Sequence, residues 1–156
     1  FANPFVAASR GYIDDVIMPH ATRKRIATLS CIHDASRNSA GELRLGYDDV
    51  TDPRKTVGAV HPLVRTHAVT GKPYLMLGRR RNAFVIGQSL EDSEALLDQL
   101  WAHATQAKFT WAQVWQQGDL VMWDNRSTMH SATTRDLPAG QYRTLYRTTV
   151  RGERPV

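Results

Sequence analysis

The chain has 156 residues, 42% of them hydrophobic and 22% charged, which fits one domain with an ordinary hydrophobic core. No apolar run approaches the ~20 residues of a membrane span, and no signal-peptide pattern opens the chain, so we expect no membrane association. The single cysteine, Cys31, excludes an internal disulfide and is typical of a reducing, cytoplasmic setting. A net charge of +5 favours small anionic partners, but the basic residues are not interleaved with exposed aromatics, which argues against nucleic acid.

Residues 1–29 are predicted to form three short elements: a helix at 4–9, a buried strand at 12–17 and a helix opened by Pro19. Their sequence resembles the C-terminal end of the carboxyltransferase subunit of propionyl-CoA and acetyl-CoA carboxylases. The glycine-rich loops that hold an acyl-CoA carbonyl in that family are absent, and so short a fragment cannot bury its own apolar face. We therefore expect a strand–helix appendage without carboxylase chemistry. Because the first residue is Phe1, we also expect the start to be internal to a longer reading frame or trimmed.

The middle of the chain is less regular. Residues 33–58 are polar and rich in turn formers, so we interpret them as a long connection with one helical turn near 48–50. Three elements are expected after it: a structured stretch at 61–67, a turn at 69–72 and a strand at 73–77. The basic run Arg79-Arg80-Arg81 that follows is interpreted as a solvated loop tip.

The sequence from Ser89 onward predicts one helix and several strands. Ser89, followed three positions later by Asp92, has the form of a helix N-cap. Leucines then recur at helical spacing and predict an amphipathic helix over 90–104 that packs on a sheet. Strands are expected at 111–115, at 120–123 and, with strict alternation, at 141–150. This pattern favours a mainly β fold with helices (α+β), namely the second half of a jelly-roll barrel.

One motif indicates a chemistry. The run Gly-Asp-Leu-Val-Met-Trp-Asp-Asn-Arg at 118–126, followed by His130, Arg143 and Arg147, closely resembles the C-terminal signature of the taurine dioxygenase family. Members of that family are non-haem iron enzymes that use 2-oxoglutarate. Residues 61–72 also match the family.

The two resemblances divide the chain. Residues 1–29 are predicted to be a carboxyltransferase-like tail fragment, and residues 30–156 the C-terminal part of a dioxygenase domain of the TauD type. The second resemblance implies the C-terminal half of a double-stranded β-helix, with the tail as an N-terminal appendage.

The resemblance implies a role for each of three residues. His130 would be the distal histidine that binds Fe(II), because neutral imidazole is the usual nitrogen ligand near pH 7. Arg143 would hold the distal carboxylate of 2-oxoglutarate, and Arg147 the anionic group of the substrate, since a guanidinium offers parallel donors to two oxygens. Four positions along a strand return to the same face, so both arginines should share a face. We expect all three side chains to point into one concavity.

Half of the family's iron site is missing from the sequence. The family needs a second histidine and a carboxylate in an upstream His-x-Asp or His-x-Glu motif, and no such motif occurs in the 156 residues. One imidazole gives no preformed iron site. We therefore predict that the chain alone is inactive.

Other residues of ligand type are interpreted as structural. Asp124 lies across a turn from His130, so the spacing gives no reason to prefer it as the missing carboxylate, and we expect it to brace the end of a strand. His61 and His67 flank a strand, and structural roles are favoured for both. The Cys-Ile-His-Asp stretch at 31–34 lacks the paired spacing of a metal site.

Three functional interpretations remain open. The leading one is a truncated or chimeric Fe(II)/2-oxoglutarate-dependent dioxygenase that, when intact, hydroxylates a small sulfonate or carboxylate. The second is a non-catalytic fragment that binds small anions or a partner subunit. The third, a carboxylase-associated piece, is disfavoured by the shortness of the tail. A homo-oligomer, or a complementing chain that supplies the missing half, fits the first interpretation.

Overall fold

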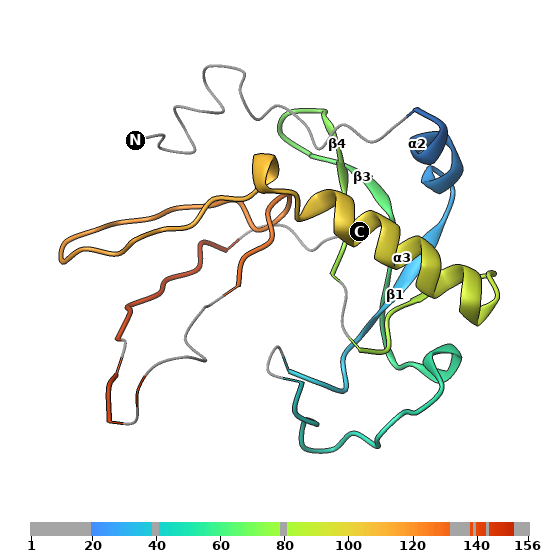
Figure 1. Ribbon diagram of the computed structural model, residues 1–156, viewed down its shortest axis with the longest axis horizontal. Helices are drawn as coiled ribbons and strands as arrows, with labels where there is room; N and C mark the ends of the chain where they lie inside the picture. The colour runs from blue at the N-terminus through green and yellow to red at the C-terminus, as the bar shows by residue number, and fades with distance from the viewer. Residues whose placement is uncertain are drawn as a thin grey trace.

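The computed structural model describes residues 20–38, 41–78, 81–131, 138, 140–142 and 144–151 (Figure 1). Its elements in chain order are helix α2 (His20–Ile26), strand β1 (Ser30–Asp34), 3-10 helix η1 (Pro53–Lys55), strands β2 (Gly58–Pro62), β3 (Val64–Thr66), β4 (Pro73–Leu75) and β5 (Phe84–Val85), helix α3 (Leu90–Ala104) and 3-10 helix η2 (Ala107–Phe109). The predicted mixed α+β class is confirmed, with small antiparallel sheets. None of the helices in this part of the chain is long and apolar enough to span a membrane.

Strand β1 is the centre of a three-stranded antiparallel sheet in the order β2-β1-β5. Cys31 of β1 pairs with His61 on one side and with Val85 on the other. Strands β3 and β4 form a separate hairpin. The sequence-based interpretation placed the start of a connection at residue 33, whereas the strand continues to Asp34. Asp34 remains in the strand although it is only 3% exposed, because its carboxylate accepts hydrogen bonds from the amide and hydroxyl of Ser36, at 2.8 and 2.6 Å.

Helix α3 packs against β5 and closes the core (Figure 1), and its bounds agree with the predicted range of 90–104. The predicted N-cap is confirmed, because the Ser89 hydroxyl accepts a hydrogen bond from the Asp92 amide at 3.0 Å. The helix also makes a direct hydrogen bond to the edge strand β5, in which the Ser93 hydroxyl accepts from the Val85 amide at 2.9 Å. Apolar residues from α2, the strands and α3 make up the core: Ile26, Cys31, Leu63, Leu77, Ala83, Val85, Leu96, Leu97 and Leu100.

The long connection between β1 and β2 is present as predicted, but its helical turn is not near 48–50. The turn is η1, at Pro53–Lys55. Asp52 caps it by accepting a hydrogen bond from the Arg54 amide at 3.0 Å. Proline at the first position of the turn already has the backbone torsion that a helix needs. These two local preferences place the turn at η1.

The strands expected at 111–115, 120–123 and 141–150 are not formed in the described residues of those ranges. Residues 110–131 instead form an extended segment, drawn in orange in Figure 1, that runs out from the end of α3, turns at 116–119 and comes back to meet the β3–β4 loop at Asp124. Most of their large apolar side chains are exposed, for example 82% for Val114 and 83% for Leu120. Alternating residues give a segment two faces, but a strand also needs a neighbouring backbone to pair with. No strand among the described residues pairs with this segment.

Helix α2 confirms the helix predicted after Pro19, and its Ile26 is 1% exposed within the core. The helix expected at 4–9 and the strand expected at 12–17 lie outside the described residues, as do Arg79 and Arg80. The division of the chain at residue 29, and the carboxyltransferase resemblance before it, remain predictions.

Candidate functional site

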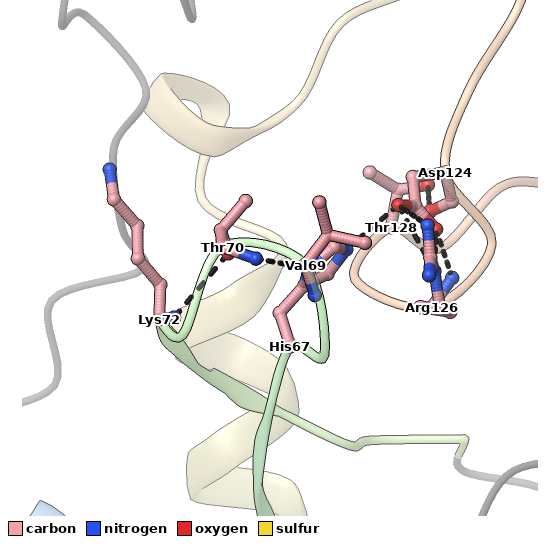
Figure 2. Close-up of polar contacts among 7 residues, drawn as sticks. All are labelled: His67, Val69, Thr70, Lys72, Asp124, Arg126 and Thr128. Carbon is pink, nitrogen blue, oxygen red and sulfur yellow. Dashed lines mark hydrogen bonds and ion pairs between the residues drawn. The ribbon is translucent and has the colours of Figure 1, made fainter.

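A tight turn over residues 124–128 leads to His130, and Asp124 organises it (Figure 2). The Asp124 carbonyl oxygen accepts hydrogen bonds from the Ser127 amide at 3.3 Å, the Thr128 amide at 3.1 Å and the Thr128 hydroxyl at 2.6 Å. The Asp124 carboxylate accepts one from the Arg126 amide and a bidentate pair from the Arg126 guanidinium, each at 2.9 Å. Asp124 therefore fixes the turn with both its main chain and its side chain.

The second donor to this carboxylate is His67, which comes from the loop between β3 and β4 (Figure 2). Its Nε2 lies 2.8 Å from Asp124 Oδ2, and its side chain is only 10% exposed. Its Nδ1 accepts hydrogen bonds from the amides of Val69 and Thr70, both at 3.2 Å. Because Nδ1 acts as an acceptor, the neutral ring carries its proton on Nε2 and donates it to Asp124. His67 thus has the structural role expected of it, whereas Asp124 holds a turn and not the strand end expected, because no strand forms at 120–123.

These contacts change the acidity of Asp124. Hydrogen bonds from the Arg126 side chain lower the pKa of the carboxyl well below its usual range. Partial burial opposes this effect, and the hydrogen bond from His67 adds to it. Asp124 is therefore a carboxylate at neutral pH, and the oxygens of that carboxylate are already occupied by donors from this chain.

His130 follows the turn and is exposed. Its imidazole lies beside the indole of Trp123, with ring centroids 5.0 Å apart and an interplanar angle of 51°. The Trp123 indole N–H donates to the Asn125 side-chain oxygen at 2.7 Å, which sets the orientation of the indole. Residues on both sides of Asp124 thus determine the surroundings of the predicted iron ligand.

Of the other two predicted site residues, only Arg147 is among the described residues. Arg147 is exposed in the described stretch 144–151, where it makes no hydrogen bond or ion pair with another described residue. Arg143 lies outside the described residues. The expectation that His130, Arg143 and Arg147 face one concavity therefore remains a prediction.

The described residues do not by themselves fit a metal ion. They contain no group of three or more histidine, cysteine, aspartate or glutamate side chains that could hold one. Asp124 is bonded to Arg126 and His67, and Asp34 is buried beside Ser36, so neither carboxylate is placed beside His130 as a second ligand. His130 could provide one of the several ligands that Fe(II) needs.

Comparison with known proteins identifies the family of the chain. The family model described as "Taurine catabolism dioxygenase TauD, TfdA family" matches residues 17–149. The chain belongs to this family, whose members are Fe(II)- and 2-oxoglutarate-dependent dioxygenases.

Three relatives illustrate the range of the family. An alpha-ketoglutarate-dependent 2,4-dichlorophenoxyacetate dioxygenase of Burkholderia sp. is 41% identical over 93 residues, which is 60% of this chain and 30% of the relative. An alpha-ketoglutarate-dependent sulfate ester dioxygenase of Pseudomonas putida is 40% identical over 96 residues, 62% of this chain and 31% of the relative. A putative alpha-ketoglutarate-dependent sulfonate dioxygenase of Schizosaccharomyces pombe is 30% identical over 146 residues, 93% of this chain and 36% of the relative.

The chain thus spans about a third of the length of the curated relatives it matches. No solved structure matches it significantly.

Sequence reasoning missed the pairing of His67 with Asp124. Each residue was assigned a structural role on its own, but 57 positions separate them. No spacing rule connects residues so far apart, so a single sequence gives no signal for this contact.

Proposed function

We propose that this chain is the C-terminal part of an Fe(II)- and 2-oxoglutarate-dependent dioxygenase domain that acts on a small anion. The family match over residues 17–149 carries the proposal. In it, His130 is one iron ligand, Arg143 binds the distal carboxylate of 2-oxoglutarate, and Arg147 binds the anionic group of the substrate. The region belongs to a jelly-roll barrel whose pairing is completed by strands from elsewhere, which accounts for the exposed apolar residues of 110–131.

The substrate class follows from charge. The relatives' names cite a phenoxyacetate, a sulfate ester and a sulfonate, each of which is a small molecule with an anionic group. A net charge of +5 and an arginine at position 147 suit the same kind of ligand. We infer a substrate with one carboxylate, sulfonate or sulfate group.

The iron needs more ligands than His130. We propose that they come from a segment outside the 156 residues or from a complementing chain, so that the chain alone does not turn over. Purified chain, incubated with Fe(II), ascorbate, 2-oxoglutarate and a panel of sulfonates, sulfate esters and phenoxyalkanoates, should form no succinate that depends on substrate. Substrate-dependent turnover would contradict this part of the proposal.

A chimera tests the roles directly. Residues 30–156 are joined to the upstream part of the Pseudomonas putida relative, which would supply the missing ligands, and succinate formation is measured. We expect turnover that His130→Ala abolishes and that His103→Ala, a change in the last turn of α3, leaves intact.

The same chimera tests the anion-binding arginine. Arg143→Ala should raise the KM for 2-oxoglutarate by about 10- to 100-fold, because a hydrogen bond to a charged group contributes about 1.5–3 kcal/mol. An inactive chimera, with anion binding by the chain that Arg147→Ala removes, would instead support the non-catalytic anion-binding fragment.

A further inference from the structure

We propose that His67 is a positioning residue for His130, acting through the Asp124 carboxylate. This inference rests on the proposed function only for the role of His130 as an iron ligand. The geometry itself involves the loop after β3, the turn at 124–128 and the hydrogen bond that joins them (Figure 2).

The loop that carries His67 is held by several hydrogen bonds. The His67 amide donates to the Lys72 carbonyl and the Gly71 amide donates to the His67 carbonyl, both at 2.8 Å. Inside the loop, Nδ1 of His67 accepts from the amides of Val69 and Thr70. Gly71 has a φ of 69°, a left-handed conformation that favours glycine. Main-chain and side-chain bonds therefore hold the imidazole in one orientation on the β3–β4 hairpin.

The ring can perform two tasks because its two nitrogens have opposite roles. Nδ1 accepts from the loop, which leaves Nε2 as the N–H that donates to Asp124 Oδ2 at 2.8 Å. This hydrogen bond links the extended segment 110–131 to the sheets. Without it, only the bonds of Asp124 to Arg126 and Thr128 would hold the turn, which would lose its attachment to the hairpin and open more often.

His130 depends on that attachment. It lies two residues beyond Thr128, whose amide and hydroxyl are bonded to the Asp124 carbonyl oxygen. On the other side of Asp124, the adjacent Trp123 places its indole against the His130 imidazole. A displacement of Asp124 therefore moves both the turn that leads to His130 and the ring that His130 contacts.

Two substitutions separate the tasks of His67. In His67→Asn, the side-chain oxygen can take the place of Nδ1 and keep the loop amides bonded, but no donor reaches Asp124. In His67→Gln, the longer amide can take the place of Nε2 and donate to Asp124, while the acceptor for the loop is lost. His103→Asn, at the end of α3, is the matched control.

The readout is NMR of the metal-free chain: the nuclear Overhauser contact between the Trp123 and His130 rings, and hydrogen exchange of the Thr128 amide. In His67→Asn, the ring contact should weaken and Thr128 exchange should accelerate about tenfold or more. His67→Gln should restore both toward wild type, and His103→Asn should change neither. Exchange of the Leu97 amide in α3 verifies that each variant is folded.

A role limited to capping the loop predicts that His130 is undisturbed in His67→Asn, and that result would overturn the proposal. A measurement on the unmodified protein gives an independent test. Long-range ¹H–¹⁵N correlation should find the His67 proton on Nε2, and a proton on Nδ1 alone would also refute the proposal. Neither readout uses metal. The result for His67 would therefore stand if His130 proved not to bind iron in the chimera, and iron binding by His130 would stand if the result for His67 failed.

Discussion

Replacing Ser93 with alanine should destabilise the fold far more than its small size suggests. The Ser93 hydroxyl is the acceptor for the Val85 amide at 2.9 Å, and both residues are 0% exposed. In Ser93→Ala the amide of this edge strand loses its acceptor at a place that water does not reach. A buried donor left without a partner costs about 2 kcal/mol, which for a chain of this length lowers Tm by about 4–8 °C.

The measurement is urea and thermal unfolding followed by circular dichroism at the helical minimum. Gln99→Ala is the matched control, because Gln99 is exposed on the same helix and its loss should change stability by no more than about 0.5 kcal/mol. Hydrogen exchange of the Val85 amide should accelerate in Ser93→Ala alone. Equal stability of Ser93→Ala and Gln99→Ala would refute the reasoning that the Ser93 hydroxyl of α3 stabilises the fold as the hydrogen-bond acceptor for the Val85 amide.

Three further predictions concern other contacts. Folding lowers the pKa of Asp124 below its ordinary value of 3.8. The Asp124 carboxylate therefore stabilises the fold fully at pH values above 3.8, and this stabilisation is lost as the pH falls through the lower pKa of the folded state. Urea unfolding of Asp124→Asn should therefore differ from wild type by a constant amount at neutral pH and converge with it in acid, and a gap that persists at the lowest pH would contradict the assignment. Gly58→Ala should lower the urea midpoint strongly, because a Cβ there would overlap the His33 carbonyl oxygen. An unchanged midpoint would show that the pairing of β1 with β2 is wrong. Burial raises the pKa of the Cys31 thiol to about 11, so a thiol reagent at pH 8 should modify it much more slowly in the folded chain than in urea, and equal rates would disprove its burial.

Features governed by near neighbours in sequence could be predicted. Ser89 and Asp92 marked the start of α3, and the leucine spacing marked its buried face. The turn at 69–72 followed from its glycine, and the hairpin places it as expected. In each case the residues that decide the structure lie within a few positions of one another.

Features governed by distant partners could not be predicted. The polar end of β1 is stable because Asp34 has buried hydrogen-bond donors, among them Asn82 at 3.5 Å and 48 residues away. His67 and Asp124 meet for the same kind of reason. Residues 111–115 alternate in the way a strand does, but a strand forms only when a second backbone segment pairs with it. The local sequence does not say whether such a segment is available.

The position of the tryptophans gives the protein an uneven optical signal. Three of the four lie in the extended segment, with exposures of 50% for Trp111, 38% for Trp115 and 40% for Trp123, while Trp101 packs at the edge of the core. Most of the intrinsic fluorescence should therefore come from indoles in contact with water, with red-shifted emission that iodide quenches readily. When another surface covers the segment, the emission should shift to the blue even though the core is unchanged. The tryptophan fluorescence of this protein should therefore report association of the extended segment far better than it reports folding of the core.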